Sequence, residues 1–129
     1  MPTTPSNPDS PASLRVLLVD DNVDALESME ILLQAFGHQV AIAPHPDQAL
    51  QLVDGFRPDA AVIDIGLPGM DGYQLAAEIR RRHPDRALRL IAFTGYGGPE
   101  DVAKAHAAGF DAHVVKPVDI DRLLAVLQA

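Results

Sequence analysis

Five polar residues stand at the ends of otherwise apolar stretches, and together they could do chemistry. They are Asp20, Asp21, Asp64, Thr94 and Lys116. Three carboxylates brought together repel each other and raise one another's pKa values unless a cation lies among them. Mg²⁺ suits such a group, since it accepts one or two carboxylates together with waters and phosphate oxygens. A carboxylate nucleophile, a metal, an ammonium and a hydroxyl donor are the parts of a site for phosphoryl transfer onto an aspartate.

The elements that must position these residues can be predicted from the alternation of the chain. Short apolar runs typical of buried strands are Leu14–Val19, Gln39–Ala43, Ala60–Ile65, Leu88–Thr94 and Ala112–Val115. A stretch with helical spacing follows each run: 23 to 36, Pro46 to about Phe56, the residues after the 66–69 loop to about Arg82, Pro99 to Gly109, and Asp119 to the end. Five such strand-then-helix units predict an α/β domain with a parallel sheet covered by helices on both faces.

The polar residues all fall at the carboxyl ends of the predicted strands, which is the edge where open parallel sheets bind ligands. If the first and third strands are neighbours, Asp20, Asp21 and Asp64 converge on one crevice. Each residue also has a simpler interpretation, because an Asp pair after a strand often caps a helix and Thr94 or Lys116 could be ordinary surface residues. Asp64 is the hardest to explain that way, because a carboxylate inside an apolar run is costly to bury unpaired.

Composition excludes several classes of function. Of the 129 residues, 47% are hydrophobic and 22% are charged, which is typical of a globular domain. Eighteen acidic residues against ten Lys and Arg give a net charge of −8, which argues against binding to nucleic acid or to an anionic membrane. The absence of cysteine excludes disulfides, thiolate metal sites and a cysteine nucleophile, and fits a cytoplasmic protein. Residues 1–13 are rich in Pro, Ser and Thr, so we expect a disordered tail or linker before a single domain over residues 14–129.

In their order and spacing these motifs resemble the receiver domain of two-component response regulators. The resemblance covers residues 14 to 129 and is carried by Asp20–Asp21, by Asp64 with the later Leu67–Gly72 stretch, by Thr94–Gly95 and by Lys116–Pro117. The stretch Ala107–His113 is most similar to receivers of hybrid sensor histidine kinases. The resemblance implies a flavodoxin-like, doubly wound (βα)5 fold with five parallel strands in the order 2-1-3-4-5.

The resemblance also implies a role for each matching residue. Asp64 would be the phosphoacceptor for a phosphoryl group from a histidine kinase or a histidine phosphotransfer protein. Asp20, Asp21, Asp64 and the backbone carbonyl of Gly66 would hold Mg²⁺ or Mn²⁺. Thr94 and Lys116 would contact the phosphoryl oxygens, and the bond between Lys116 and Pro117 would be cis. Such a domain is not an enzyme in the ordinary sense, although it assists its own phosphorylation and dephosphorylation.

Phosphorylation is expected to pull Thr94 inward and to change the face formed by the fourth helix, the fifth strand and the fifth helix. The second switch position holds His113, where an aromatic Tyr or Phe is common in the family; its imidazole could swing inward or simply fill part of the strand face. A phosphorylation-dependent homodimer through this face is a further hypothesis. The sequence leaves open whether the chain is a stand-alone shuttle, a phosphorelay component or a piece of a hybrid kinase.

Three other functions compete with the phosphoacceptor. A haloacid-dehalogenase-type phosphatase needs a second Asp two residues after the nucleophile, where this chain has Gly66. A flavodoxin-like cofactor binder needs a first loop rich in Ser, Thr and Gly, and Asp20–Asp21 would repel its phosphate. The third alternative is a pseudo-receiver that binds partner proteins without being phosphorylated; the presence of all five site residues weighs against it.

Overall fold

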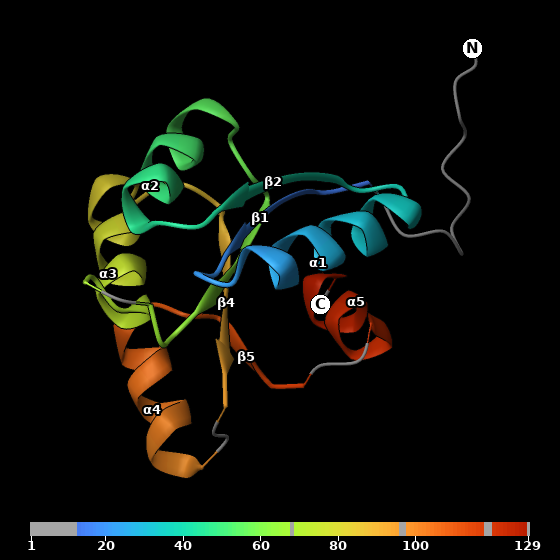
Figure 1. Cartoon of the computed structure of the whole chain (residues 1–129). Coiled ribbons are helices and arrows are strands. Elements are labelled where there is room, and N and C mark those ends of the chain that lie inside the picture. The colour runs from blue at the N-terminus through green and yellow to red at the C-terminus, as the bar shows by residue number, and fades with distance from the viewer. Residues whose placement is uncertain (1–12, 68, 96–97, 118–119, 129) are drawn as a thin grey trace.

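The chain folds into a five-stranded parallel sheet between two layers of helices, as seen in a computed structural model that describes residues 13–67, 69–95, 98–117 and 120–128 (Figure 1). The strands are β1 (Arg15–Val19), β2 (Gln39–Ala43), β3 (Ala60–Asp64), β4 (Arg89–Thr94) and β5 (Ala112–Val115). The helices are α1 (Val23–Ala35), α2 (Pro46–Gly55), α3 (Gly72–Arg82), α4 (Pro99–Ala108) and α5 (Ile120–Gln128). The predicted alternation is confirmed, with element ends that differ from the predicted ones by a residue or two.

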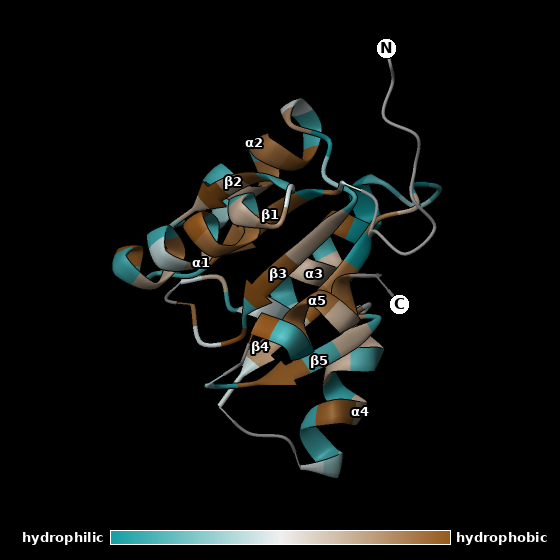
Figure 2. Cartoon of the chain, turned by 90° about the vertical axis from the view of Figure 1, so that its right-hand side faces the viewer, coloured by the Kyte–Doolittle hydropathy of each residue, from teal (hydrophilic) through white to brown (hydrophobic). Residues whose placement is uncertain are grey.

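The strand order is β2-β1-β3-β4-β5, and every pairing is parallel. This order confirms the predicted doubly wound topology. Because β1 lies directly beside β3, the residues that follow β1 come next to the end of β3. The three central strands are buried along almost their whole length, as their apolar sequences require, and Figure 2 shows hydrophobic residues concentrated on them.

Two apolar cores hold the helices against the sheet. On one face, residues of α2, α3 and α4 such as Val53, Leu75 and Ala105 pack against the strands. On the other face, α1 and α5 contribute residues such as Leu33 and Leu123. Alternate residues of a strand point to opposite faces, so each buried strand supplies both cores.

The predicted tail at residues 1–13 lies outside the described residues except for Ser13, whose hydroxyl donates to the Gly37 carbonyl at 2.8 Å. The predicted start of the last helix at Asp119 also lies outside them. Within the described part of the chain, no helix combines the length and the apolar character needed to cross a bilayer.

Candidate functional site

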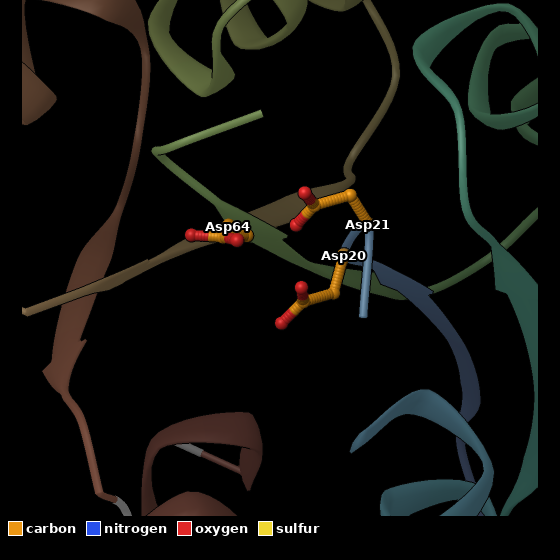
Figure 3. A group of neighbouring side chains, drawn as sticks. All are labelled: Asp20, Asp21 and Asp64. Carbon is orange, nitrogen blue, oxygen red and sulfur yellow. The ribbon is translucent and has the colours of Figure 1, made fainter. Parts of the chain in front are cut away.

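The three predicted carboxylates meet at the carboxyl edge of the sheet. Asp20 and Asp21 follow β1, and Asp64 is the last residue of β3. One carboxylate oxygen from each lies within 4.8 Å of the others, and Figure 3 shows the three side chains gathered at this edge. The side chain of Asp21 is exposed, whereas Asp20 and Asp64 are only 6% and 7% exposed. Two of the three charges are therefore held at a site with little access to water.

Lys116 is the cation that the protein itself supplies to this cluster. Its Nζ lies 3.2 Å from Asp64 Oδ1 and 3.7 Å from Asp20 Oδ2. The backbone N–H of Lys116 donates to the Thr94 carbonyl at 2.7 Å, which ties the end of β5 to the end of β4. The peptide bond between Lys116 and Pro117 is cis. One ammonium thus faces two of three clustered carboxylates.

The loop after β3 fixes the position of Asp64. The Gly66 N–H donates to Asp64 Oδ1 at 3.1 Å. At the start of α3, a Cβ on Gly72 would lie 2.6 Å from the Asp64 carbonyl oxygen, so only glycine allows this close approach. Asp71 and Gln74 form a capping box that begins α3 at this point. The helix start is therefore packed directly against the backbone of Asp64.

Burial raises the pKa of Asp20, and the nearby charge of Asp64 raises it further. Two groups oppose this shift: the Asn22 N–H, which donates to Asp20 Oδ1 at 3.0 Å, and the Lys116 ammonium. A raised pKa means that the site holds negative charge at a cost to the folded protein. A cation added among the carboxylates would reduce that cost.

The remaining predicted residues lie around the cluster. Thr94 ends β4 and is buried, with 9% of its surface exposed. His113 is half-buried on β5, where it pairs with Ala92 two positions before the Thr94–Val115 pair. Gly66 is exposed beside Asp64. The roles of Thr94 and His113 as switch residues, and of the Gly66 carbonyl as a ligand, stay predictions.

The donor set of the cluster fits a hard divalent cation. Its ligand atoms are carboxylate oxygens, which Mg²⁺ and Mn²⁺ prefer over softer donors. Asp20, Asp21 and Asp64 can each offer one oxygen within the same small region. The Asn22 and Gly66 N–H groups hold the side chains of Asp20 and Asp64, so two of the three carboxylates are positioned before any ion binds.

Sequence reasoning missed Phe93, which lies beside the cluster. Phe93 pairs with Asp64 in the β3–β4 register, and the Lys116 Nζ lies 4.9 Å from the centroid of its ring. Such a contact attracts an ammonium to the face of the ring. Counting alternate positions along the strand would have placed Phe93 and Thr94 on opposite faces of the sheet.

Comparison with known proteins agrees with this geometry. The family profile described as "Response regulator receiver domain" matches residues 16–128. The chain belongs to this family of two-component signalling domains, as the motifs at Asp20–Asp21, Asp64, Thr94 and Lys116 predicted.

The proteins that are similar to this chain in sequence have different lengths. An uncharacterized 14.6 kDa protein of Leptolyngbya boryana is 33% identical over 117 residues, which cover 91% of this chain and 89% of that protein. The virulence transcriptional regulatory protein PhoP of Salmonella typhimurium is 36% identical over 117 residues, or 90% of this chain and 51% of PhoP. The chain thus spans about half the length of the PhoP proteins that it matches.

Solved structures show the same fold. The chemotaxis protein CheY4 of Vibrio cholerae superposes with a TM-score of 0.84 at 27% identity, over 91% of this chain and 98% of that chain. A CheY-like response regulator receiver domain protein of Methanospirillum hungatei gives a TM-score of 0.79 at 32% identity, over 88% of this chain and 90% of that chain.

Proposed function

We propose that this receiver domain accepts a phosphoryl group on Asp64 from a phosphohistidine of a histidine kinase or a histidine phosphotransfer protein in the cytoplasm. An oxygen of the Asp64 carboxylate forms the new bond to phosphorus, and the bond from phosphorus to the imidazole nitrogen of the donor breaks. The imidazole leaves neutral after taking a proton from solvent. The domain acts as a phosphoacceptor that is switched, and not as an enzyme that turns over a separate substrate.

The observation that carries this proposal is the position of Lys116 against Asp64. The ammonium lies 3.2 Å from an oxygen of a carboxylate that is 7% exposed, with two more carboxylates gathered beside it. A fixed ammonium at that point can pair with the negative oxygens of the arriving phosphoryl group without reorganising. Thr94, at the end of the neighbouring strand, is the hydroxyl that we assign to another phosphoryl oxygen.

Asp20, Asp21, Asp64 and the Gly66 carbonyl are the groups that we assign to Mg²⁺ or Mn²⁺. When bound, the metal neutralises charge on the transferring phosphoryl group and helps to orient it. The protein's part is to keep the carboxylates together in its absence, through the donors from Asn22 and Gly66 and through Lys116.

The response to phosphorylation is proposed to run through Thr94 and His113 to the face of α4, β5 and α5. A bound phosphoryl group can shift that face only by binding one arrangement more tightly than the other. Phosphorylation-dependent pairing of two copies through this face is the accompanying hypothesis, which sedimentation with and without beryllofluoride tests.

The experiment is intact-mass measurement after incubation with acetyl phosphate and Mg²⁺. We expect the wild-type chain to gain one phosphoryl group, and Asp64→Asn or a chelator to abolish the gain. Asp85→Asn is the matched control, since it makes the same change at an exposed position in the loop between α3 and β4.

An adduct that forms equally on Asp64→Asn would overturn the assignment of the phosphoacceptor. If the wild type shows no adduct, Mg²⁺-dependent binding of beryllofluoride separates fast hydrolysis from inactivity. Failure of both measurements would leave the pseudo-receiver, a partner-binding domain without phosphorylation, as the better account.

A further inference from the structure

A cavity of about 640 Å³ opens beside the carboxylates and is much more apolar than phosphoryl chemistry needs. Its apolar walls come from β1, α1, β3, β4 and α5, through Leu18, Leu26, Met29, Val62, Phe93 and Leu123. Four of these side chains are at most 5% exposed, and Met29 and Phe93 are half-buried. The cavity therefore extends from the polar edge of the sheet into the space between α1 and α5.

The volume and lining of this cavity are those of a small-molecule site. Such sites typically measure about 300–1,000 Å³ and combine mostly apolar walls with a few polar groups that fix the orientation of the ligand. Here the polar groups lie together at one end, as Asp20, Asp21, Asp64 and Lys116. The proposed phosphoryl transfer uses only this polar end, so the apolar walls have no part in it.

The charges at the polar end select the kind of ligand. Three carboxylates and one ammonium leave two negative charges in excess when all four groups are ionised. A cationic headgroup is therefore attracted there, and an anionic one is repelled by the same carboxylates. Phe93 adds an aromatic ring to the wall next to this end, which favours an apolar ligand body; the cation near this ring is the protein's own Lys116 ammonium, at 4.9 Å.

We propose that this cavity binds an amphipathic ammonium compound, with its aryl or alkyl body between α1 and α5 and its ammonium among Asp20, Asp21 and Asp64. This ligand goes beyond the phosphoacceptor role. Because the ammonium and a divalent cation use the same carboxylates, their binding is mutually exclusive. A compound of this class would make the metal site, and any reaction that depends on it, responsive to a small molecule.

The first experiment is an NMR titration of the ¹⁵N-labelled whole chain with 4-phenylbutylamine, without metal or phosphodonor. We expect saturable shifts of amide signals from α1, the end of β1 and α5. The neutral analogue 4-phenylbutanol should bind at least about tenfold more weakly, because its hydroxyl can donate to a carboxylate but carries no positive charge to pair with it. The anionic 4-phenylbutyrate should bind more weakly still.

Competition with Mg²⁺ tests whether the headgroup lies among the carboxylates. For two ligands that exclude each other, Mg²⁺ at ten times its own Kd raises the apparent Kd of the amine about elevenfold. An amine whose apparent Kd does not change with Mg²⁺ would overturn the proposal, and so would equal affinity for the amine and the carboxylate. The comparison of the amine with the carboxylate needs neither Mg²⁺ nor phosphorylation of Asp64, so this proposal and the proposed function fail separately.

A pair of variants tests the apolar part of the cavity. Ala25 is exposed on α1 and lines the cavity, so Ala25→Phe should fill part of it and weaken binding of the amine at least about tenfold, as expected when a ligand loses its apolar contacts. Ala35→Phe makes the same change at an exposed position of the same helix, outside the cavity lining, and should leave the affinity unchanged. Equal affinities of the two variants would overturn the proposal, and the wild-type series of three ligands decides the matter even if Ala25→Phe fails to fold.

Discussion

The two edges of the sheet carry charged side chains in opposite arrangements. At the amino edge, arginines bind carbonyl groups of the backbone: Arg15 donates to Phe56, Arg86 to Val53 and Pro58, Arg89 to Val126, and Arg80 to Gly109 and Leu88. At the carboxyl edge, three carboxylates lie together, and two of them, Asp20 and Asp64, face the Lys116 ammonium and each accept from one backbone N–H.

This difference separates charges that hold the fold from charges that are available for chemistry. A guanidinium that donates to fixed carbonyls joins loops and helix ends. Its N–H donors are then occupied by the protein itself. Carboxylates that have too few hydrogen-bond donors in the protein can still bind an external cation. Without that cation they make the folded state less stable. Substitutions at the two edges should therefore change the free energy of unfolding in opposite directions.

The largest effect is expected for Arg80→Ala at the amino edge. Arg80 joins three elements, since it also forms an ion pair with Asp111 at 2.8 Å, and its side chain is 29% exposed. Its removal takes a donor from the carbonyls of Leu88 and Gly109 and the ion-pair partner from Asp111, which keeps only its bond from the Leu90 N–H. We therefore expect the free energy of unfolding to fall by about 2–3 kcal/mol. Urea denaturation measures this change.

Arg81→Ala is the matched control on the same helix. Arg81 pairs only with Glu78, three residues earlier, and is 69% exposed, so solvent and salt screen the contact. The control should lower stability much less. If the two variants were equally stable, the bonds of Arg80 to the backbone would add no more than an exposed surface pair.

The sequence predicts the carboxyl edge better than the amino edge, for a physical reason. Asp20, Asp64 and Lys116 each lie at a strand end, and the parallel sheet alone brings such ends together. Arg80 lies inside a helix, and its partners at Leu88 and Gly109 depend on how α3 packs beside the α4–β5 loop. No local pattern encodes that packing.

The cavity was hidden from the sequence for the same reason. Its walls are ordinary core residues such as Leu26, Val62 and Leu123, each of which the apolar pattern correctly places inside. Whether they meet or leave a space depends on the separation of α1 and α5, two helices from opposite ends of the chain. Periodicity predicts that a residue is buried, but does not predict the separation of packed helices.

A second effect concerns pH and the one buried imidazole of the amino edge. Burial lowers the pKa of His38 below its ordinary 6.5. Its Nδ1 accepts from the Leu14 N–H at 3.0 Å, which requires the neutral ring, and among the described residues its buried Nε2 has no partner. The unfolded chain binds a proton at His38 more readily than the folded chain does. The contribution of the neutral His38 to stability is therefore fully present above pH 6.5 and is lost as pH falls toward the pKa of His38 in the folded protein.

The measurement is chemical denaturation between pH 8 and pH 5 for the wild type and for His38→Gln, whose side chain does not titrate. Below pH 6.5 the free energy of unfolding should fall more steeply with decreasing pH for the wild type than for the variant. The two slopes should differ by at most about 1.4 kcal/mol per pH unit, since one proton is involved. The amide oxygen of Gln can still accept from Leu14. Parallel pH profiles for the two proteins would show that His38 is not the group responsible.

The smallest effect, and the one of opposite sign, is expected for Asp20→Asn at the carboxyl edge. Asp20 is 6% exposed and its pKa is raised, chiefly by burial, so the neutral amide avoids the cost of a buried charge while its oxygen still accepts from Asn22. We expect the metal-free protein to become more stable by about 1 kcal/mol. Mg²⁺ should reverse the order, because it stabilises the wild type by an amount that rises with the logarithm of its affinity, and the variant has lost a ligand. Thermal melts of both proteins with and without Mg²⁺ measure the two signs together.

A loss of stability without metal would mean that Asp20 contributes to the fold as the arginines of the amino edge do, and the contrast between the two edges would not hold at this residue.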